Sequence, residues 1–333
     1  MKQSVVIIGA GPAGLSAAYA LTSDGVRPVV LEQTDKVGGI ARTEVFQGYR
    51  FDIGGHRFFS RDQEVLRLWQ QMLGPDLLKV PRLSRISYDG HLLNYPLELT
   101  NALSHLGVLE SIRIVLSYLQ ARLLPHRDDH TFEGWVTNRL GRRLFESFFR
   151  PYTEKVWGIP CSEIEADWAA QRISGLSIRT ALANALFGTG AVDTLISEFQ
   201  YPVLGPGMMW ERFREVVECR GAEVQLGTRV LQVEIEGNRV RNVVALRDQK
   251  TVEIAGEHYV SSMPLNDLLA AISPPPPGEV LEAARRLRYR AFLLVGLIID
   301  RADLFPDNWI YVHDPNLKVG RIQNFKNWSA AMV

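Results

Sequence analysis

At the start of the chain, short apolar runs and one helical stretch alternate in the order strand, helix, strand. Val5–Ile8 is a run of four large aliphatic residues, and its length and β-branching are typical of a buried parallel strand. Leu15–Thr22 has helical spacing, and Val29–Glu32 is a second apolar run that ends in an acid. This order predicts a β-α-β unit of the Rossmann type, and we predict an α/β fold for the chain.

Helical and strand patterns continue along the rest of the sequence. Helical spacing marks the ranges Val65–Met72, Leu99–Leu124, Phe132–Phe149 and Glu211–Cys219. Strand patterns mark Glu223–Leu226 and Arg229–Glu236 with Asn242–Leu246 and Thr251–Ile254 as their partners, and also Arg85–Leu93, Tyr259–Met263, Arg290–Ile299 and Trp309–Val312. Asp89-Gly90 predicts a hairpin turn within Arg85–Leu93. The strongly apolar core of the second helical range, Leu106–Leu124, favours a buried helix over one that lies on a membrane surface.

The turn between the first strand and the first helix is rich in glycine and reads Gly9-Ala10-Gly11-Pro12-Ala13-Gly14. In this pattern the first glycine allows a tight turn, the second lets the backbone approach a pyrophosphate, and the third lets the helix pack on the strand. The pyrophosphate would bind the free amides of the helix N-terminus. Glu32 ends the second strand, where an acid accepts the ribose hydroxyls of a dinucleotide. We therefore predict a dinucleotide site.

A second glycine pair, Gly38-Gly39, follows the second strand and is itself followed by Arg42. This arrangement resembles the second phosphate signature of FAD enzymes with the glutathione-reductase-like fold, in which the arginine helps to neutralise the pyrophosphate. We therefore predict FAD rather than NAD, bound by a glutathione-reductase-like domain. The alternative for Arg42 is a solvated charge in a loop, which its spacing from Gly39 disfavours.

The sequence Gly54-Gly55-His56 follows a turn at Gln47-Gly48. Two glycines before a histidine suggest that the backbone closely approaches something flat. One interpretation places this loop against the isoalloxazine ring, with His56 near its reactive edge. The other is a glycine turn whose histidine is hydrogen-bonded within the protein, and the residues alone leave both interpretations open.

Two loops divide these elements into two domains. The Gly205–Gly207 loop and the stiff run Pro274–Pro277 bracket a return to short strands. We predict a discontinuous FAD-binding domain of residues 1–85 and 203–275. Residues 86–202 and 276–333 would form a mixed helical and antiparallel-sheet substrate domain.

Composition and charge narrow the classes of function. The chain has 333 residues, enough for two domains, with a formal net charge of zero at pH 7, so neither a nucleic-acid partner nor a polybasic lipid-binding role has electrostatic support. Cys161 and Cys219 are isolated, which suggests a reducing compartment. The chain enters its first strand almost at once, leaving no room for a signal peptide, and it contains no long apolar run, so we expect a cytoplasmic protein without a transmembrane segment. The His126–His130 cluster reads as a solvated loop, and no metal is predicted.

Several stretches resemble a known family. The chain is similar to UDP-galactopyranose mutase, particularly the eukaryotic-type enzymes, in Gly54-Gly55-His56, Arg150–Trp157, Trp168–Arg172 and Trp309–Arg321. The wider relatives are the protoporphyrinogen-oxidase and amine-oxidase flavoproteins, which share the N-terminal glycine motifs. The resemblance implies a UDP-sugar substrate and bound FAD, with NADPH or NADH as a candidate reductant. Oligomeric state is left open.

The resemblance also assigns roles to residues of the second domain. Tyr152 would stack on or near the uracil, and Trp157 would border the sugar pocket. Trp309 and Tyr311 would line the cleft. The alternative for each is a packed aromatic side chain with no ligand.

Three residues would form the catalytic set. The resemblance places His56 by the flavin and has Arg172 and Arg321 hold the diphosphate together. The cofactor-binding residues would be Gly9, Ala10, Gly11, Pro12, Ala13, Gly14, Glu32, Gly38, Gly39, Arg42, Gly54, Gly55 and Val230.

The sequence departs from the family in two places. These flavoproteins close the FAD site with a strand and helix near their C-terminus, which also supply tyrosines and an arginine, and we expect this segment to be absent from a sequence that stops at Val333. The Leu204–Trp210 loop is only roughly like its counterpart in the mutase. Two enzyme classes therefore stay open: a redox-neutral nucleotide-sugar mutase, and an FAD oxidoreductase acting on a small organic substrate. A flavin-binding fragment without activity is a third alternative.

Overall fold

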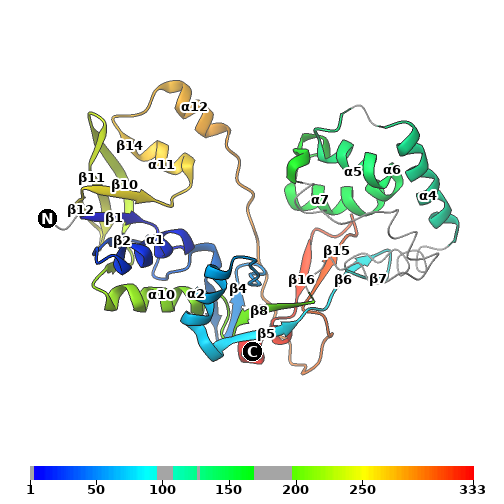
Figure 1. The fold of residues 1–333 in the computed structure, drawn as a ribbon, viewed down its shortest axis with the longest axis horizontal. Coiled ribbons are helices and arrows are strands. Elements are labelled where there is room, and N and C mark those ends of the chain that lie inside the picture. The colour runs from blue at the N-terminus through cyan, green and yellow to red at the C-terminus, as the bar shows by residue number, and fades with distance from the viewer. Residues whose placement is uncertain (1–3, 96–107, 126–127, 169–196) are drawn as a thin grey trace. The chain divides into compact units, whose positions relative to one another are not determined.

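The computed structural model describes residues 4–95, 108–125, 128–168 and 197–333. The chain forms two compact units, each assembled from separated stretches of sequence (Figure 1). The first unit holds residues 1–80, 199–300 and 328–333, and the second holds residues 81–198 and 301–327. The crossovers predicted from the sequence were residues 85, 203 and 275. The last of these differs most, because the helix after the proline run packs on the helix before it and the chain stays in the first unit through Asp300.

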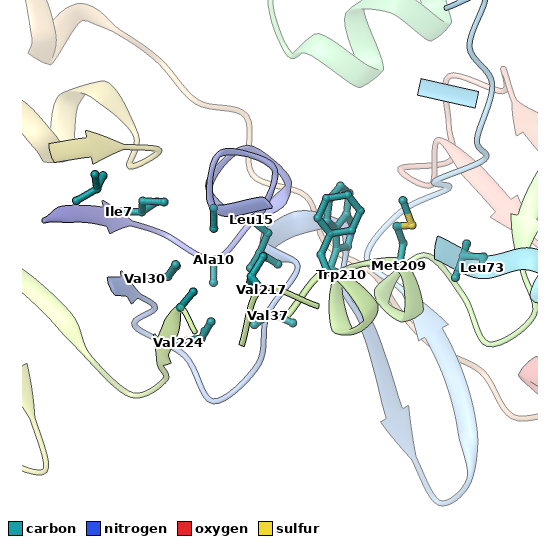
Figure 2. Close-up of a cluster of buried hydrophobic side chains, with 14 of the residues drawn as sticks. Ile7, Ala10, Leu15, Val30, Val37, Leu73, Met209, Trp210, Val217 and Val224 are labelled. Carbon is teal, nitrogen blue, oxygen red and sulfur yellow. The ribbon is translucent and has the colours of Figure 1, made fainter. Parts of the chain in front are cut away.

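A parallel sheet forms the centre of the first unit. Its strand order is β13-β1-β2-β9, and the strands are β1 (Val5–Ile8), β2 (Val29–Leu31), β9 (Glu223–Gln225) and β13 (His258–Ser261). All three pairings are parallel. Helices α1 (Pro12–Ser23) and α10 (Gly207–Cys219) contact each other, and their apolar side chains share one buried cluster with the strands (Figure 2). The predicted β-α-β unit is confirmed.

A second sheet in the first unit has the order β12-β11-β10-β14. Its strands are β10 (Arg229–Glu236), β11 (Arg239–Arg247), β12 (Lys250–Ala255) and β14 (Ile272–Ser273). Helix α11 (Leu265–Ala271) directly precedes β14, and helix α12 (Gly278–Arg286) follows it. The predicted antiparallel pairing of β10, β11 and β12 is confirmed. The range Glu223–Leu226 was predicted to join this group, but its strand β9 pairs with β2 instead, since a parallel partner completes the first sheet.

Shorter elements complete the first unit. They are the hairpin of β3 (Thr43–Phe46) and β4 (Tyr49–Asp52), helix α2 (Gln63–Leu73), and the two-stranded sheet of β5 (Leu77–Pro81) and β8 (Glu198–Pro202). Helix α2 begins at Asp62, whose carboxylate accepts hydrogen bonds from the amides of Glu64 and Val65. Trp328 packs edge-on against Phe199 and Tyr201, so the last residues of the chain belong to this core.

The second unit combines a four-stranded sheet with a helical cluster. The sheet has the order β16-β15-β6-β7, formed by β6 (Ser84–Tyr88), β7 (His91–Asn94), β15 (Trp309–Val312) and β16 (Arg321–Gln323). The helices are α4 (Val108–Leu123), α5 (Phe132–Leu140), α6 (Arg142–Leu144), a π-helical turn (Phe145–Phe149) and α7 (Arg150–Trp157). The hairpin predicted at Asp89-Gly90 is confirmed, with positive φ at both residues. With its sheets of both kinds, the chain has the predicted mixed α/β architecture.

Four element predictions differ from the structure. Arg290–Ile299 has strand-like apolar residues but forms no strand, because no neighbouring segment among the described residues pairs with it. The range Phe132–Phe149 is broken at Gly141, whose φ of 85° ends α5. Helix α10 begins at Gly207 rather than Glu211, since Pro206 takes the N-cap position. Helix α4 buries Ile114, Tyr118 and Ala121 but leaves Leu116 60% exposed. The helix that was predicted to be buried therefore buries only one of its faces.

Candidate functional site

The glycine turn after β1 has the geometry that its sequence predicts. Gly9 has φ of 101°, which only glycine adopts at little cost, and its amide donates to the carbonyl of Leu31 at 2.7 Å. A Cβ on Gly14 would lie 1.8 Å from the carbonyl oxygen of Gly9, so the helix packs on the turn only with glycine there. Helix α1 begins at Pro12, and within the described residues no side chain caps its first turn.

No backbone angle and no packing contact within the protein explains why residue 11 is a glycine. Its φ of −77° suits any residue, and a Cβ built there would meet nothing closer than the Cα of Gly39, at an ordinary 3.7 Å. Neither backbone strain nor crowding therefore requires glycine at this position. The space that a methyl group would fill lies at the amide end of α1, where a phosphate can bind. The residues present fit a dinucleotide pyrophosphate.

The second glycine pair lies directly against the first motif. The amide of Gly38 donates to the carbonyl of Ala10 at 2.8 Å, and a Cβ on Gly39 would lie 3.2 Å from the Cα of Gly11. Two motifs about thirty residues apart in sequence thus form one backbone surface, as a bound pyrophosphate requires. Arg42, however, is engaged: its Nε lies 2.5 Å from Glu44 Oε1. Hydrogen bonds from Lys36 and then from Arg42 lower the pKa of that carboxyl.

Glu32 is buried at the end of β2 and links the two motifs. One carboxylate oxygen accepts from the amide of Ala10 at 2.9 Å, and the other accepts from the amide and hydroxyl of Thr34 at 3.0 and 2.9 Å. Because each oxygen has two lone pairs and Oε2 uses only one of its own, the carboxylate can still accept a hydrogen bond from a ribose hydroxyl. Val230 is 9% exposed and packs in an apolar cluster with Val6, Ile8 and Leu31, so its side chain belongs to the core.

His56 follows the Gly54-Gly55 turn as expected, and its ring is already hydrogen-bonded. Its Nε2 lies 2.8 Å from the carbonyl oxygen of Ile53. Gly54 has φ of 95°, and a Cβ there would lie 3.8 Å from the ring of Phe292. The contact with Ile53 matches the interpretation of a locally bonded histidine, and an additional role beside a flavin stays a proposal.

Asp52 and Tyr201 form a buried pair that the sequence did not reveal. Asp52 is fully buried at the end of β4, where its carboxyl accepts hydrogen bonds from the hydroxyls of Tyr201 and Thr43. Burial raises the pKa of Asp52 to about 7, although both hydrogen bonds favour the ionised form. The pair ties the β3–β4 hairpin to β8 directly before the Gly54-Gly55 loop. A lone aspartate in a strand gives no local signal of such a partner.

The raised pKa of Asp52 makes the stability of the first unit depend on pH. The folded state holds this proton up to about pH 7, whereas the unfolded chain releases it near the ordinary value of 3.8. Between about pH 4 and 7 the free energy of unfolding should therefore fall as pH rises, by about 1.4 kcal/mol per pH unit at most. Asp52→Asn should abolish this slope. The free energy of unfolding of wild type and variant is measured by urea unfolding at several pH values, and the difference between the two is compared across pH. A difference that is independent of pH would contradict the assignment.

In the second unit, Tyr152, Tyr311 and Arg321 form an aromatic and cationic cluster. Tyr311 and Arg321 are cross-strand partners on β15 and β16, and the guanidinium carbon of Arg321 lies 5.1 Å from the centre of the Tyr311 ring. Tyr152, from α7, meets the Tyr311 ring edge-on at 5.5 Å. Burial raises the pKa of Tyr152, while the charge of Arg321 and a hydrogen bond from it act in the opposite direction. The fold therefore brings together three of the residues singled out from the sequence.

Two further residues of this cluster were missed. The His313 ring is buried and lies flat against Tyr152, with ring centres 4.8 Å apart and planes 15° apart. The ammonium group of Lys155 donates to the carbonyls of Val312 and Asp314, at 2.9 and 2.5 Å. A histidine two residues after Tyr311 could have been noticed, because it follows the end of a predicted strand.

The remaining predicted residues lie in different surroundings. Trp309 is buried at 3% exposure, with the guanidinium carbon of Arg82 5.6 Å from its ring centre, so its side chain belongs to the core of this unit. Trp157 is 39% exposed and meets Trp168 edge-on at 5.3 Å, as a second aromatic pair. Arg172 lies outside the described residues.

The parallel sheet, the glycine turn and the acid at the end of β2 define the first unit as a dinucleotide-binding domain of the flavoprotein type. The chain belongs to the flavin-containing amine oxidoreductase family, whose family model matches residues 12–321. This family consists of flavin-containing enzymes.

Curated relatives cover the chain in part. It is 28% identical over 270 residues to a lycopene-forming phytoene desaturase of Pantoea ananas. The aligned region covers 73% of this chain and 52% of the desaturase. It is 24% identical over 178 residues to a probable UDP-galactopyranose mutase of Klebsiella pneumoniae. That aligned region covers 50% of this chain and 44% of the mutase. The chain thus spans about half the length of these relatives.

Solved structures show the same fold over most of the chain. A crystal structure of reduced UDP-galactopyranose mutase superposes on this chain with a TM-score of 0.82 and 19% identity. The match covers 99% of this chain and 72% of the mutase chain. A putative protoporphyrinogen oxidase from Exiguobacterium sp. 255-15 matches 94% of this chain and 70% of its own, with a TM-score of 0.64 and 17% identity. At these identities the likeness concerns the fold alone. No described helix is long and apolar enough to cross a membrane.

Proposed function

We propose that this chain belongs to an FAD enzyme that acts on a nucleotide sugar in the manner of UDP-galactopyranose mutase. The observation that carries the substrate class is the cluster of Tyr152, Tyr311 and Arg321, where a permanent cation lies against aromatic faces. A uracil needs a flat apolar surface, and a diphosphate needs a fixed positive partner. Both needs are met within one small group of side chains. The mutase-like fold supports the same substrate class.

The first unit would hold the cofactor. The amide end of α1, together with Gly11 and Gly39, would bind the pyrophosphate, and Glu32 would accept the adenosine ribose hydroxyls. Arg42 would exchange Glu44 for a phosphate oxygen, since the same guanidinium cannot serve both fully. When bound, the reduced flavin would supply the covalent or redox chemistry at the sugar.

The second unit would bind and orient the UDP portion. Arg321 is exposed, and within the described part of the chain no carboxylate forms an ion pair with it, so its fork is available to a diphosphate. Tyr152 and Tyr311 would bound the base or ribose from two directions, because their rings stand perpendicular to each other. The protein's part in catalysis is then orientation and charge neutralisation. Arg172 would be the second cation at this diphosphate.

The second candidate is an FAD oxidoreductase that oxidises a small organic substrate. It is favoured by the family itself, which is described as flavin-containing amine oxidoreductases. An amine or hydrocarbon substrate has no diphosphate and gains nothing from the guanidinium in the cluster of Tyr152, Tyr311 and Arg321, here called the substrate cluster. The two candidates therefore differ in whether UDP binds the protein.

Thermal unfolding with and without UDP separates the two candidates. UDP at millimolar concentration should raise the melting temperature, because a ligand that binds only the folded state stabilises it. Inorganic phosphate at equal ionic strength is the control for nonspecific anion effects. No shift with UDP, together with a shift by a diamine such as putrescine, would favour the oxidoreductase.

A further inference from the structure

His313 is buried at the centre of the substrate cluster and has no role in the proposed function. Its backbone amide donates to the carbonyl of Ser87 at 3.0 Å, which places the residue just beyond β15. One face of the imidazole lies flat on Tyr152, and the ring centre of Phe148 is 6.5 Å from that of His313, with the two planes 59° apart. The buried ring therefore packs against aromatic residues of two helical segments.

Packing alone does not account for a histidine here. One ring nitrogen is hydrogen-bonded to the backbone of Phe148. Nδ1 is buried and has no hydrogen-bond partner among the described residues. A phenylalanine would fill similar space without an unmet polar atom, so what the histidine adds is the hydrogen bond that fixes the rotation of its ring.

The imidazole is neutral in this environment. Burial and then the charge of Lys155 lower the pKa of His313 to about 4, although the bond to Phe148 opposes this. Lys155 is held between the carbonyls that flank His313, so its charge cannot easily move away. Because the ring is uncharged, it adds no further positive charge behind Tyr152 and Arg321.

We propose that His313 is a positioning residue: its hydrogen bond to Phe148 and its stacking on Tyr152 fix the plane of the tyrosine ring, so that Tyr152 and Arg321 form a preformed surface for a nucleotide. This inference rests on the proposed nucleotide site. It adds a residue that touches no ligand but determines how well the cluster is organised before binding.

Three variants test the proposal, with UDP affinity and melting temperature measured for each. His313→Ala should weaken UDP binding about ten-fold or more, because the stacking face is lost. His313→Phe should retain the melting temperature but weaken binding several-fold, since its ring can stack without being fixed by a hydrogen bond. His313→Gln, whose amide can donate to the same carbonyl, should recover part of the loss. His130→Ala, at an exposed histidine of the same unit, is the matched control and should bind UDP normally.

A second measurement does not depend on UDP. The pKa of the Tyr152 phenol is measured by ultraviolet pH titration. For each protein, the titration of the same protein carrying Tyr152→Phe is subtracted, so that only the Tyr152 signal remains. In His313→Ala the pKa of Tyr152 should fall towards its ordinary value, because water reaches the ring. The proposal is overturned if His313→Phe binds UDP as wild type does, or if the Tyr152 titration is unchanged in His313→Ala. A wild-type protein that does not bind UDP refutes the nucleotide site, and the titration still decides whether His313 organises Tyr152.

Discussion

Substituting alanine for Arg321 is expected to weaken UDP binding at least ten-fold while leaving flavin uptake unchanged. The guanidinium lies over Tyr311 and beside the Tyr152 hydroxyl. Among the described cations of the substrate cluster, it is the one that best suits a diphosphate. A charge-assisted hydrogen bond contributes about 1.5–3 kcal/mol, and about 1.4 kcal/mol corresponds to ten-fold in affinity. Calorimetric titration with UDP measures the change.

Arg321→Lys should recover only part of this affinity. A lysine ammonium is a point charge and cannot make the two parallel hydrogen bonds of the guanidinium fork. Arg139→Ala is the matched control, because Arg139 also lies over an aromatic ring, that of Trp135, but pairs with Asp129 on the surface. Equal UDP affinity in Arg321→Ala and wild type would contradict the nucleotide-sugar function and leave the oxidoreductase as the better candidate.

Gly11→Ala is expected to prevent flavin binding without unfolding the protein. The added methyl group would make only an ordinary contact of 3.7 Å with Gly39, and the φ of −77° is normal for alanine. The same methyl group would occupy the space where the pyrophosphate approaches the amides of α1. We expect the ratio of flavin to protein after FAD addition and desalting to fall at least ten-fold, with the melting temperature of the flavin-free protein nearly unchanged.

Gly278→Ala is the control for the general effect of adding a methyl group. Gly278 begins helix α12, and a Cβ there meets no atom within 4 Å. Gly14→Ala gives the opposite extreme, because its Cβ would collide with the carbonyl of Gly9 and should destabilise the unit itself. If Gly11→Ala retains flavin as wild type does, the pyrophosphate does not lie at this turn. If wild type takes up no flavin at all, the cofactor assignment for this chain fails.

The nucleotide-binding half of the fold was predictable because its signals are local. Val5–Ile8 and the glycine turn specify a strand, a turn and a helix within about twenty residues, and Gly9 and Gly14 each have a distinct steric reason. The pairing of β10 with β11 was predictable for the same reason, since the strands are adjacent in sequence. By contrast, β9 pairs with a strand almost two hundred residues earlier, and no local pattern indicates that partner.

The substrate cluster was predicted only in part. Tyr311 and Arg321 were named through their resemblance to a family, and the structure explains their proximity by the register of β15 and β16. Asp52 and His313 were missed, because a single polar residue in or beside a strand gives no periodicity from which to infer burial. Their pKa values depend on partners far away in sequence, such as Tyr201 for Asp52. Such pairs become visible only when the fold places them together.

The route of the chain through the two units has a consequence for protein synthesis. The central strand β1 is translated about 250 residues before its parallel neighbour β13, and Trp328 of the same unit is translated later still. On a growing chain, β1 therefore exposes an apolar strand edge until β13 has left the ribosome. The second unit also contains residues 301–327, so neither unit can mature before the other has been largely synthesised. Until those stretches are present, the exposed strand edge favours aggregation, which chaperones counteract.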